Sequence, residues 1–286
     1  MGIVVNTNVS SFIVQRSLSS ATSSMSKSLE RLSTGYRINR AADDAAGLTI
    51  SESLKSQGRG AEVAASNAQA GVNLLQTAEG DLGIIQENLQ RIRDLAIQAA
   101  NGTNDTAERG AIKDEVEQRV KEISRIATSS SFNTIKLLDG SQTSLSLQIG
   151  PNFNSTAVTL NSLTIGSPLG KADATTLGIN TTTSTFLTTS FSTSLKCSSY
   201  ISLIDSAIST ISTRRSTIGS LQNRLESTIQ SLAIKKENVM AAESRIRDVD
   251  VAKEAAFLTK NQILQQASAS LLAQANQAPS VALSLI

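Results

Sequence analysis

The longest hydrophobic pattern in the chain runs from Tyr200 to Gln277. An apolar residue recurs there every seven positions, which keeps one side of an α-helix apolar and turned toward a partner helix. The second core position of the heptad holds both apolar and polar residues. If continuous, this helix is about 100 Å long at about 1.5 Å per residue, and we expect it to stop before Pro279. The seven-residue series is Ile204, Ile211, Ile218, Leu225, Leu232, Val239 and Ile246, and the mixed position holds Ile201, Ile208, Arg215, Gln222, Ile229, Lys236 and Glu243.

A second pattern of the same kind covers residues 61–99, where apolar residues alternate steps of three and four. Small residues make up its first part, and they pack closely but specify a partner weakly. Asn101 and Gly102 are expected to stop this helix, and a third helix follows over about residues 106–128. The two seams, at 61–99 and 201–249, are expected to bury one another, so the chain folds back at its middle.

The N-terminal part predicts a first helix from Ser10 to about Thr34, with Ser10 or Ser11 as its cap. Gly35 ends it, and residues 36–48 are typical of a connector with local ion pairs. Leu18, Met25, Leu29 and Leu32 share one side of this helix.

Two adjacent carboxylates, Asp43 and Asp44, lie in that connector near Arg37 and Arg40. Such a pair could bind a cation, but carboxylates flanked by arginines are more often part of a solvated turn, and this second interpretation is favoured.

The composition changes near Ser129, after which the chain is rich in Ser, Thr, Asn and Gly up to Lys196. Alternating apolar residues around a Gly- and Asn-rich stretch predict a β-hairpin. Residues 168–196 have no firm periodicity, so we expect an exposed, replaceable segment. The Ser and Thr clusters could be O-glycosylated or could be an unmodified polar surface. The alternating residues are Leu145, Leu147, Ile149, Val158 and Leu160.

The amino-acid composition makes some classes of protein function less plausible than others. Aromatic residues make up 3% of the chain and histidine is absent, which favours helix-on-helix packing of small and branched residues over a compact enzyme. A net charge of +2 gives no argument for nucleic acid or an anionic membrane. The only cysteine, Cys197, could be a reactive thiol beside Lys196, but an inert small residue is favoured.

Both ends of the chain lack charge: no charged side chain occurs in residues 1–15 or 261–286. The N-terminus has no basic region or long apolar core of a signal peptide, and no apolar run approaches 18 residues, so export would need another route. Helices with uncharged apolar stripes need burial, which contacts among copies in a helical polymer would supply. We expect this terminal seam to mediate polymerisation through Leu18, Met25, Leu29, Leu32, Phe257, Leu264 and Leu271.

Four segments together resemble bacterial flagellin over nearly the whole chain. They are RLSTGYRINRAADD at 31–44, QRIRDLAIQAA at 90–100, SRIRDVD at 244–250 and NQILQQASASLLAQANQ at 261–277. The resemblance implies a structural protein, not an enzyme, that is a mainly α, long antiparallel coiled-coil rod with paired terminal helices and a small central β-hairpin. It implies no cofactor, no metal site and no catalytic residues.

The same resemblance implies a domain organisation. Residues 1–45 and 250–286 would form an inner-core terminal coiled coil. Residues 46–167 and 197–249 would form a helical rod with the β-hairpin, and residues 168–196 a short, exposed variable segment.

The resemblance also implies location and partners. The chain would be exported unfolded through the flagellar type III channel and would polymerise with copies of itself into an extracellular filament for swimming motility. Its further partners would be the flagellar cap protein, the hook-junction proteins and a C-terminal export chaperone. Neither nucleic acid nor membrane is expected.

A possible receptor contact is implied as well. The segment QRIRDLAIQ is similar to the one by which Toll-like receptor 5 senses many flagellins, so Arg91, Leu95 and Glu115 are the candidate contacts. Alternatively, Leu95 packs in the core, Arg91 lines a subunit contact and Glu115 is a solvated charge. Asp94 stands where the family more often has Glu, and Cys197 departs from a mostly cysteine-free family.

Other functions remain as alternatives. Within the family a hook-filament junction protein is possible, although the ending QILQQASASLLAQANQ favours the filament protein. An intracellular coiled-coil scaffold would have similar seams but no need for neutral ends. An enzyme is the weakest alternative, because histidine and a phosphate loop are both missing.

Overall fold

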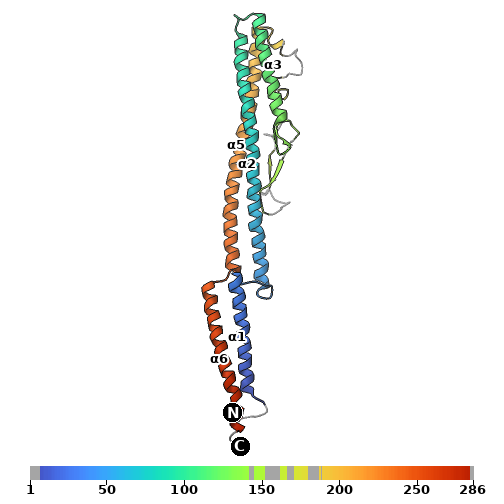
Figure 1. Cartoon of the computed structure of the whole chain (residues 1–286). Helices are drawn as coiled ribbons and strands as arrows, with labels where there is room; N and C mark the ends of the chain where they lie inside the picture. The colour runs from blue at the N-terminus through green and yellow to red at the C-terminus, as the bar shows by residue number, and fades with distance from the viewer. Residues whose placement is uncertain are drawn as a thin grey trace. The chain divides into compact units, whose positions relative to one another are not determined.

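The computed structural model describes residues 7–141, 145–151, 162–165, 171–179, 187 and 189–283. The chain divides into two compact units, one of residues 1–56 and 237–286 and the other of residues 57–236. The predicted mainly helical class with paired terminal helices and a β-hairpin is confirmed. The elements in chain order are α1 (Val9–Thr34), α2 (Ala45–Ala100), α3 (Thr106–Ser129), β1 (Ser131–Phe132), β2 (Ile135–Lys136), β3 (Leu145–Gln148), β4 (Ser162–Ile165), α5 (Ser194–Arg247) and α6 (Val251–Leu283) (Figure 1).

Helix α1 begins and ends with recognisable caps. Its N-terminal cap is Asn8, whose side-chain oxygen accepts from the backbone N–H of Ser11 at 3.0 Å. The expected cap at Ser10 or Ser11 is therefore wrong, because Asn8 already supplies the acceptor one turn ahead. Gly35 ends α1 as predicted: it adopts φ 76°, and its N–H donates to the Arg31 carbonyl at 2.9 Å.

The long C-terminal pattern is two helices, because the chain leaves the helical conformation between Arg247 and Val251. Asp250 starts the second one: its carboxylate accepts from the N–H of Lys253 at 3.0 Å. The continuous helix considered from the heptads is therefore wrong.

Helix α6 also continues past Pro279 to Leu283, so the expected stop there is wrong. A proline leaves the carbonyl four residues earlier without its helical donor. The carbonyl of Ala275 accepts instead from Asn8 Nδ2 at 2.7 Å, which replaces the missing hydrogen bond.

The connector between α1 and α2 is shorter than predicted, because α2 begins at Ala45. Asp44 accepts from the N–H of Gly47 at 2.8 Å and caps α2. The other carboxylate, Asp43, accepts from the N–H groups of Asn39 and Arg40, each at 3.2 Å. Both carboxylates thus serve the turn, which favours the turn interpretation over a cation site.

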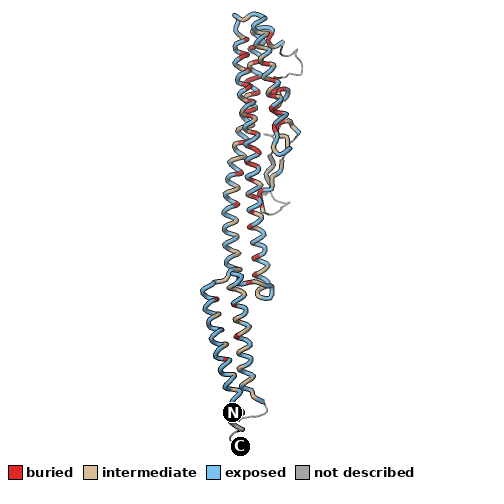
Figure 2. The backbone as a smooth tube through the Cα atoms, in the orientation of Figure 1, coloured by how far each residue is buried: buried red, intermediate tan, exposed pale blue. Residues whose placement is uncertain are grey.

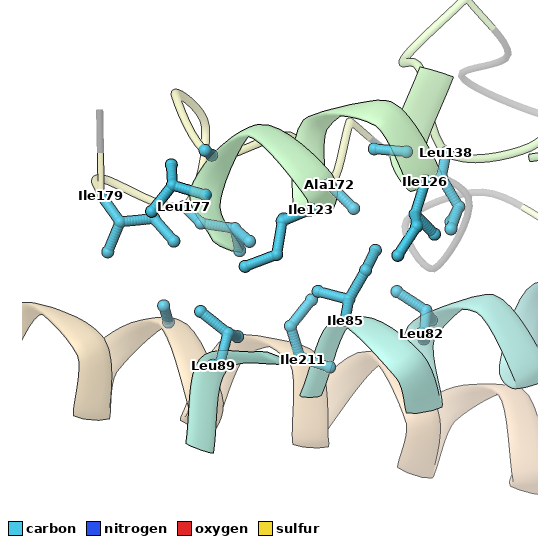
Figure 3. Close-up of a cluster of buried hydrophobic side chains, with 14 of the residues drawn as sticks. Leu82, Ile85, Leu89, Ile123, Ile126, Leu138, Ala172, Leu177, Ile179 and Ile211 are labelled. Carbon is cyan, nitrogen blue, oxygen red and sulfur yellow. The ribbon is translucent and has the colours of Figure 1, made fainter. Parts of the chain in front are cut away.

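The main hydrophobic core of the unit of residues 57–236 is shared by α2, α3 and α5. Buried residues line the facing sides of these helices (Figure 2), and the two predicted seams meet there. Leu82, Ile85 and Leu89 of α2 face side chains of α3, α5 and the segment 171–179 (Figure 3). The buried members of the α2 seam are Ala61, Ala64, Ala68, Leu75, Ala78, Leu82, Ile85, Leu89, Ile92, Ala96 and Ala99, and those of α5 include Ile204, Ile211, Ile218, Leu225 and Leu232.

The mixed heptad position of α5 carries polar contacts to α2. Arg215 pairs with Glu79 at 3.5 Å, and Gln222 Nε2 donates to the same carboxylate at 3.1 Å. Lys236 pairs with Glu62 at 3.1 Å. Helix α5 thus contacts α2 through two rows, one apolar and one partly polar. The polar contacts fix the register of α5 against α2 without placing a charge in the core.

Among the described residues, the β part consists of two small antiparallel pairs. A tight turn at Asn133 and Thr134, both with positive φ, joins β1 to β2. The predicted hairpin is confirmed as the β3–β4 pair, in which Leu145 lies opposite Ile165. The alternation at Val158 and Leu160 lies outside the described residues, and the pairing strand is 162–165.

The segment expected to be an exposed variable region contributes to the core instead. Ala172 donates its N–H to the Leu138 carbonyl at 2.9 Å and has no exposed surface. Within it, residues 171–179 lie outside any helix or strand, so their apolar residues follow no helical or strand period. Its buried residues are Ala172, Ala174, Leu177, Ile179, Leu187 and Phe191.

Cys197 is fully buried in the same core. Burial raises the pKa of its thiol, which keeps it protonated and weakly nucleophilic. The inert interpretation is favoured.

Candidate assembly surface

The unit of residues 1–56 and 237–286 contains α1 and α6 packed side by side (Figure 1). Ser11 Oγ donates to Asn276 Oδ1 at 2.9 Å, and Gln265 Nε2 donates to Thr22 Oγ1 at 3.4 Å. Residue numbers on α1 therefore rise as those of the α6 partners fall. The two helices are antiparallel. The ion pair between Arg31 and Glu254, at 3.6 Å, has the same register.

The face of α6 toward α1 combines polar and apolar residues. Glu254, Asn261 and Ser268 are its buried residues, at seven-residue spacing, and α1 contributes the buried Ala21 and Ser28. Leu258 and Leu272 of the same face are half-buried, so the pair buries its apolar side chains only in part. The tan and pale blue colours of α1 and α6 in Figure 2 show how little of this pair is buried.

The large apolar side chains of the pair are mostly exposed. On α6, Phe257, Leu264 and Leu271 are 45%, 44% and 53% exposed. At about 2 kcal/mol for complete burial of a large apolar side chain, each leaves roughly 1 kcal/mol unused. Exposed apolar residues in this number mark an interaction surface. The exposed large apolar residues of the two helices are Val9, Phe12, Ile13, Leu29, Val251, Phe257, Ile263, Leu264 and Leu271.

Grooves lie beside this apolar row. One of about 490 Å³ is lined by Leu264 and by small α1 residues such as Ser17, Ser20 and Ser24. Another of about 460 Å³ is lined by Phe257 together with the basic side chains of Lys253 and others. Open space next to exposed apolar residues gives the side chains of another molecule room to insert.

The predicted terminal seam is divided between two faces. Leu18, Met25 and Leu32 are half-buried, with the same spacing as the buried face of α1, whereas Leu29 is exposed. The three residues predicted on α6 are all on its exposed row. The structure thus brings together part of the predicted set within one chain and leaves the rest available to other molecules.

A hydrogen-bonded junction holds the chain between the helices of this unit. Val249 donates its N–H to the Gly35 carbonyl at 3.0 Å, and the N–H of Arg37 donates to the Arg247 carbonyl at 2.6 Å. Tyr36 and Asp248 form an antiparallel bridge. The break after α5 and the connector after α1 therefore bind each other through backbone atoms.

Ion pairs tie the connector to α1. Lys27 Nζ lies 2.7 Å from Asp43, and Arg40 lies 2.9 Å from Glu30. The hydrogen bond from Lys27, with those from the two backbone N–H groups, lowers the pKa of Asp43 to about 2. This carboxylate thus stays ionised and fixes the connector at all but strongly acidic pH.

Two of the three candidate receptor contacts lie together in the other unit. Arg91 of α2 is exposed, Glu115 of α3 is half-buried, and the two form an ion pair at 3.3 Å. Leu95 is 2% exposed and packs in the core, which matches the packing alternative. The structure therefore offers the charged pair to a partner, but not the Leu95 side chain.

Sequence reasoning missed the polar row of Glu254, Asn261 and Ser268. Their common seven-residue spacing was a usable signal, because a heptad position can be polar. It was overlooked because the parallel apolar row three residues later, at Phe257, Leu264 and Leu271, has the same period and is the stronger hydrophobic pattern.

Comparison with known proteins identifies the family. Residues 5–143 match the bacterial flagellin N-terminal helical region, and residues 201–286 match the bacterial flagellin C-terminal helical region. A flagellin from Halalkalibacterium halodurans is 40% identical over 284 residues, which cover 99% of this chain and 100% of that protein. The chain belongs to the bacterial flagellin family.

Other relatives agree with this flagellin assignment. A flagellar filament core protein from Brachyspira hyodysenteriae is 40% identical over 292 residues, which cover 99% of this chain and 100% of that protein. The solved structure of a putative flagellar hook-associated protein from Vibrio parahaemolyticus is 14% identical, with a TM-score of 0.55, and covers 72% of this chain and 100% of that one. That similarity concerns the fold alone.

Family membership gives this flagellin its role as a structural subunit of the flagellar filament. Within the described residues, no helix combines the length and apolar character needed to cross a bilayer.

Proposed function

We propose that this flagellin polymerises through its α1–α6 pair, whose exposed apolar side chains become buried among neighbouring copies. The observation that supports this most strongly is the exposure of an apolar row on α6, at Phe257, Leu264 and Leu271, beside the face that α1 covers. Contacts that join different faces of successive copies need not close into a ring, so they build a helical filament.

The absence of charge supports the same role. No charged side chain follows Lys260 and none precedes Arg16. Since burial of an unpaired charge is costly, uncharged chain ends suit a crowded interior in which each end touches several copies.

The polymer acts outside the cell in swimming motility, as the relation to filament proteins suggests. The subunit reaches that site unfolded through the flagellar type III channel. The incomplete burial between α1 and α6 supports this route, because helices with few fully buried residues need little free energy to separate before transport.

Family membership supports the proposal of further partners. We assign the cap and hook-junction proteins to the two ends of the polymer and an export chaperone to the C-terminal helix before assembly. Recognition by Toll-like receptor 5 would use the Arg91–Glu115 pair while Leu95 keeps the helix packed. An intracellular coiled-coil scaffold is disfavoured, since it would not require an exposed apolar row on its terminal pair.

Deletion of residues 261–286 tests this function. We expect a soluble monomer with an intact unit 57–236, because the core of that unit contains no residue of α6. Sedimentation and negative-stain microscopy after salting out would show filaments for the unmodified chain and none for the deletion. Filaments from the deleted chain would exclude the proposed role of the C-terminal helix.

A further inference from the structure

Asn101 and Gly102 form the only Asn-Gly pair in the sequence, and they lie in the short connection between α2 and α3. Both residues are exposed. In such a pair the backbone nitrogen of the second residue can attack the side-chain amide of the first, because glycine has no side chain to obstruct the approach. The fold around the pair decides whether that attack can take place.

The attacking nitrogen, that of Gly102, is not held by the fold. Its N–H donates to no other atom of the described residues. The neighbouring N–H groups of Asn101 and Thr103 donate to the Gln98 carbonyl at 3.2 Å and to Asn101 Oδ1 at 3.3 Å. Gly102 does not have a positive φ, and a Cβ added to it would meet no atom of the described residues within 4 Å. The nitrogen is therefore available for reaction, and the position has room for alanine.

The Asn101 side chain is folded over its own peptide group. Its Oδ1 accepts the hydrogen bond from the Thr103 N–H, which closes a turn that contains both the Asn101 Cγ and the Gly102 nitrogen. The same hydrogen bond would stabilise the negative charge that Oδ1 acquires when the nitrogen attacks Cγ. The turn therefore keeps the two reacting atoms close together and assists the reaction between them.

Asn104, in the same connection, lacks these conditions. The nitrogen that would attack it belongs to Asp105, whose N–H donates to Glu108 Oε2 at 3.1 Å within the capping box of α3. The side-chain amide of Asn104 donates to the Gln98 carbonyl at 2.7 Å. Asn104 thus has the same solvent and the same loop as Asn101, but both of its reacting groups are occupied, so it should stay intact.

The only Asp-Gly pair in the sequence, Asp139 and Gly140, could form the same kind of ring. The Asp139 carboxylate accepts from the Ser141 hydroxyl at 2.6 Å and from the Ser141 N–H at 2.8 Å. These hydrogen bonds lower the pKa of Asp139. An ionised carboxylate is a poor electrophile, so this pair should not react at neutral pH.

We propose that Asn101 is a site of spontaneous deamidation, at which the folded chain converts an amide to a carboxylate without an enzyme. The Gly102 nitrogen gives its proton to hydroxide and bonds to Cγ, and the side-chain nitrogen leaves as ammonia with a proton from water. Water then opens the resulting succinimide at either carbonyl, which produces aspartate or isoaspartate. The new negative charge lies beyond the C-terminal end of α2, where the helix dipole disfavours it.

The test incubates the purified full chain at mildly alkaline pH, because the attacking nitrogen must lose its proton. Peptide mass spectrometry measures conversion at Asn101 and Asn104, and an isoaspartate-specific methyltransferase provides a second readout. In the folded chain we expect Asn101 to convert about tenfold faster than Asn104 or more. Its rate should be no less than about a third of the rate in guanidinium chloride, because the fold leaves the reacting atoms accessible.

Gly102→Ala is the matched variant, because the position has open space and no positive φ. It should keep the thermal midpoint of the unmodified chain and convert Asn101 about tenfold more slowly, since a methyl group obstructs the attacking nitrogen. A variant that converted at the unmodified rate would exclude the Gly102 nitrogen as the nucleophile.

Equal conversion of Asn101 and Asn104 in the folded chain would overturn the inference, because the hydrogen bonds of the loop would then select nothing. Conversion of Asn101 in guanidinium chloride but not in the folded chain would overturn it too, since the fold would then protect the amide. An Asn101 that stayed intact in both conditions would exclude the reaction altogether.

Discussion

The guanidinium carbon of Arg247 lies 4.6 Å from the ring centroid of Tyr36, so the cation stacks on the aromatic face. Arg247 also pairs with Glu52 at 2.7 Å and with Glu243 at 3.9 Å. One side chain at the end of α5 thereby contacts the connector after α1, the first turns of α2 and its own helix. This arrangement makes Arg247 the central side chain of the junction.

Replacing Arg247 with alanine should open that junction. We expect a loss of about 1 to 3 kcal/mol in the free energy of unfolding, because the stacking on Tyr36 and the ion pairs of a largely buried guanidinium disappear together. Arg247→Lys should recover only part of it, since an ammonium cannot stack as a planar guanidinium does. Urea unfolding measures the loss, and hydrogen exchange at the amides of Arg37 and Val249 locates it.

The control for this prediction is Arg245→Ala, two residues away on the exposed side of the same helix. It should change the free energy of unfolding by less than about 0.5 kcal/mol. If the two variants were equally stable, the stacked arginine would have no special role in the junction.

The lowered pKa of Asp43 predicts an acid-dependent contribution to stability. The pKa is about 2 in the folded chain and about 3.9 when unfolded. The contribution is therefore complete above about pH 4 and is lost as the pH falls through 2. Asp43→Asn should be less stable than the unmodified chain at pH 7 and equal to it below pH 2, as measured by urea unfolding across this range.

The surface variant Asp114→Asn serves as the reference, because Asp114 is 71% exposed. Its stability should follow that of the unmodified chain at every pH. A stability difference for Asp43→Asn that did not shrink on acidification would contradict the ion pair with Lys27 as the cause.

Much of the helical fold could be predicted from the sequence because its interfaces repeat at a fixed period. The rows that include Leu82 and Ile211 are buried as the heptads indicate. The break at residues 248–250 and the passage through Pro279 depend on contacts with Gly35 and Asn8. No periodicity within one segment reveals partners that lie more than 200 residues away in sequence.

The candidate site was predicted less completely, for a physical reason. The sequence indicates that Leu264 and Phe257 seek burial, but it does not indicate whether the partner is α1 or another molecule. The structure answers this, because α1 covers the row that contains Asn261 and leaves Leu264 44% exposed.

Because residues 171–179 include buried side chains, we expect substitutions there to destabilise the fold, whereas substitutions in a replaceable surface segment would not. Ile179→Ala should lower the free energy of unfolding by about 2 to 5 kcal/mol, because it leaves a cavity where a fully buried side chain stood. The neighbouring exposed change Thr175→Ala should have little effect. Thermal unfolding of the two variants measures the difference. If both melted at the temperature of the unmodified chain, the segment would be exposed and not part of the core.

The exposed apolar row of the terminal pair is the central feature of this account, and Leu264→Asp tests it most directly. A charge placed where neighbouring copies bury a leucine costs several kcal/mol, so the concentration needed for polymerisation should rise more than tenfold. Leu195→Asp is the matched control, since Leu195 is an 80% exposed leucine on α5. Sedimentation of both variants should show filaments for Leu195→Asp and almost none for Leu264→Asp. Filaments of Leu264→Asp at the concentration of the unmodified chain would contradict the account.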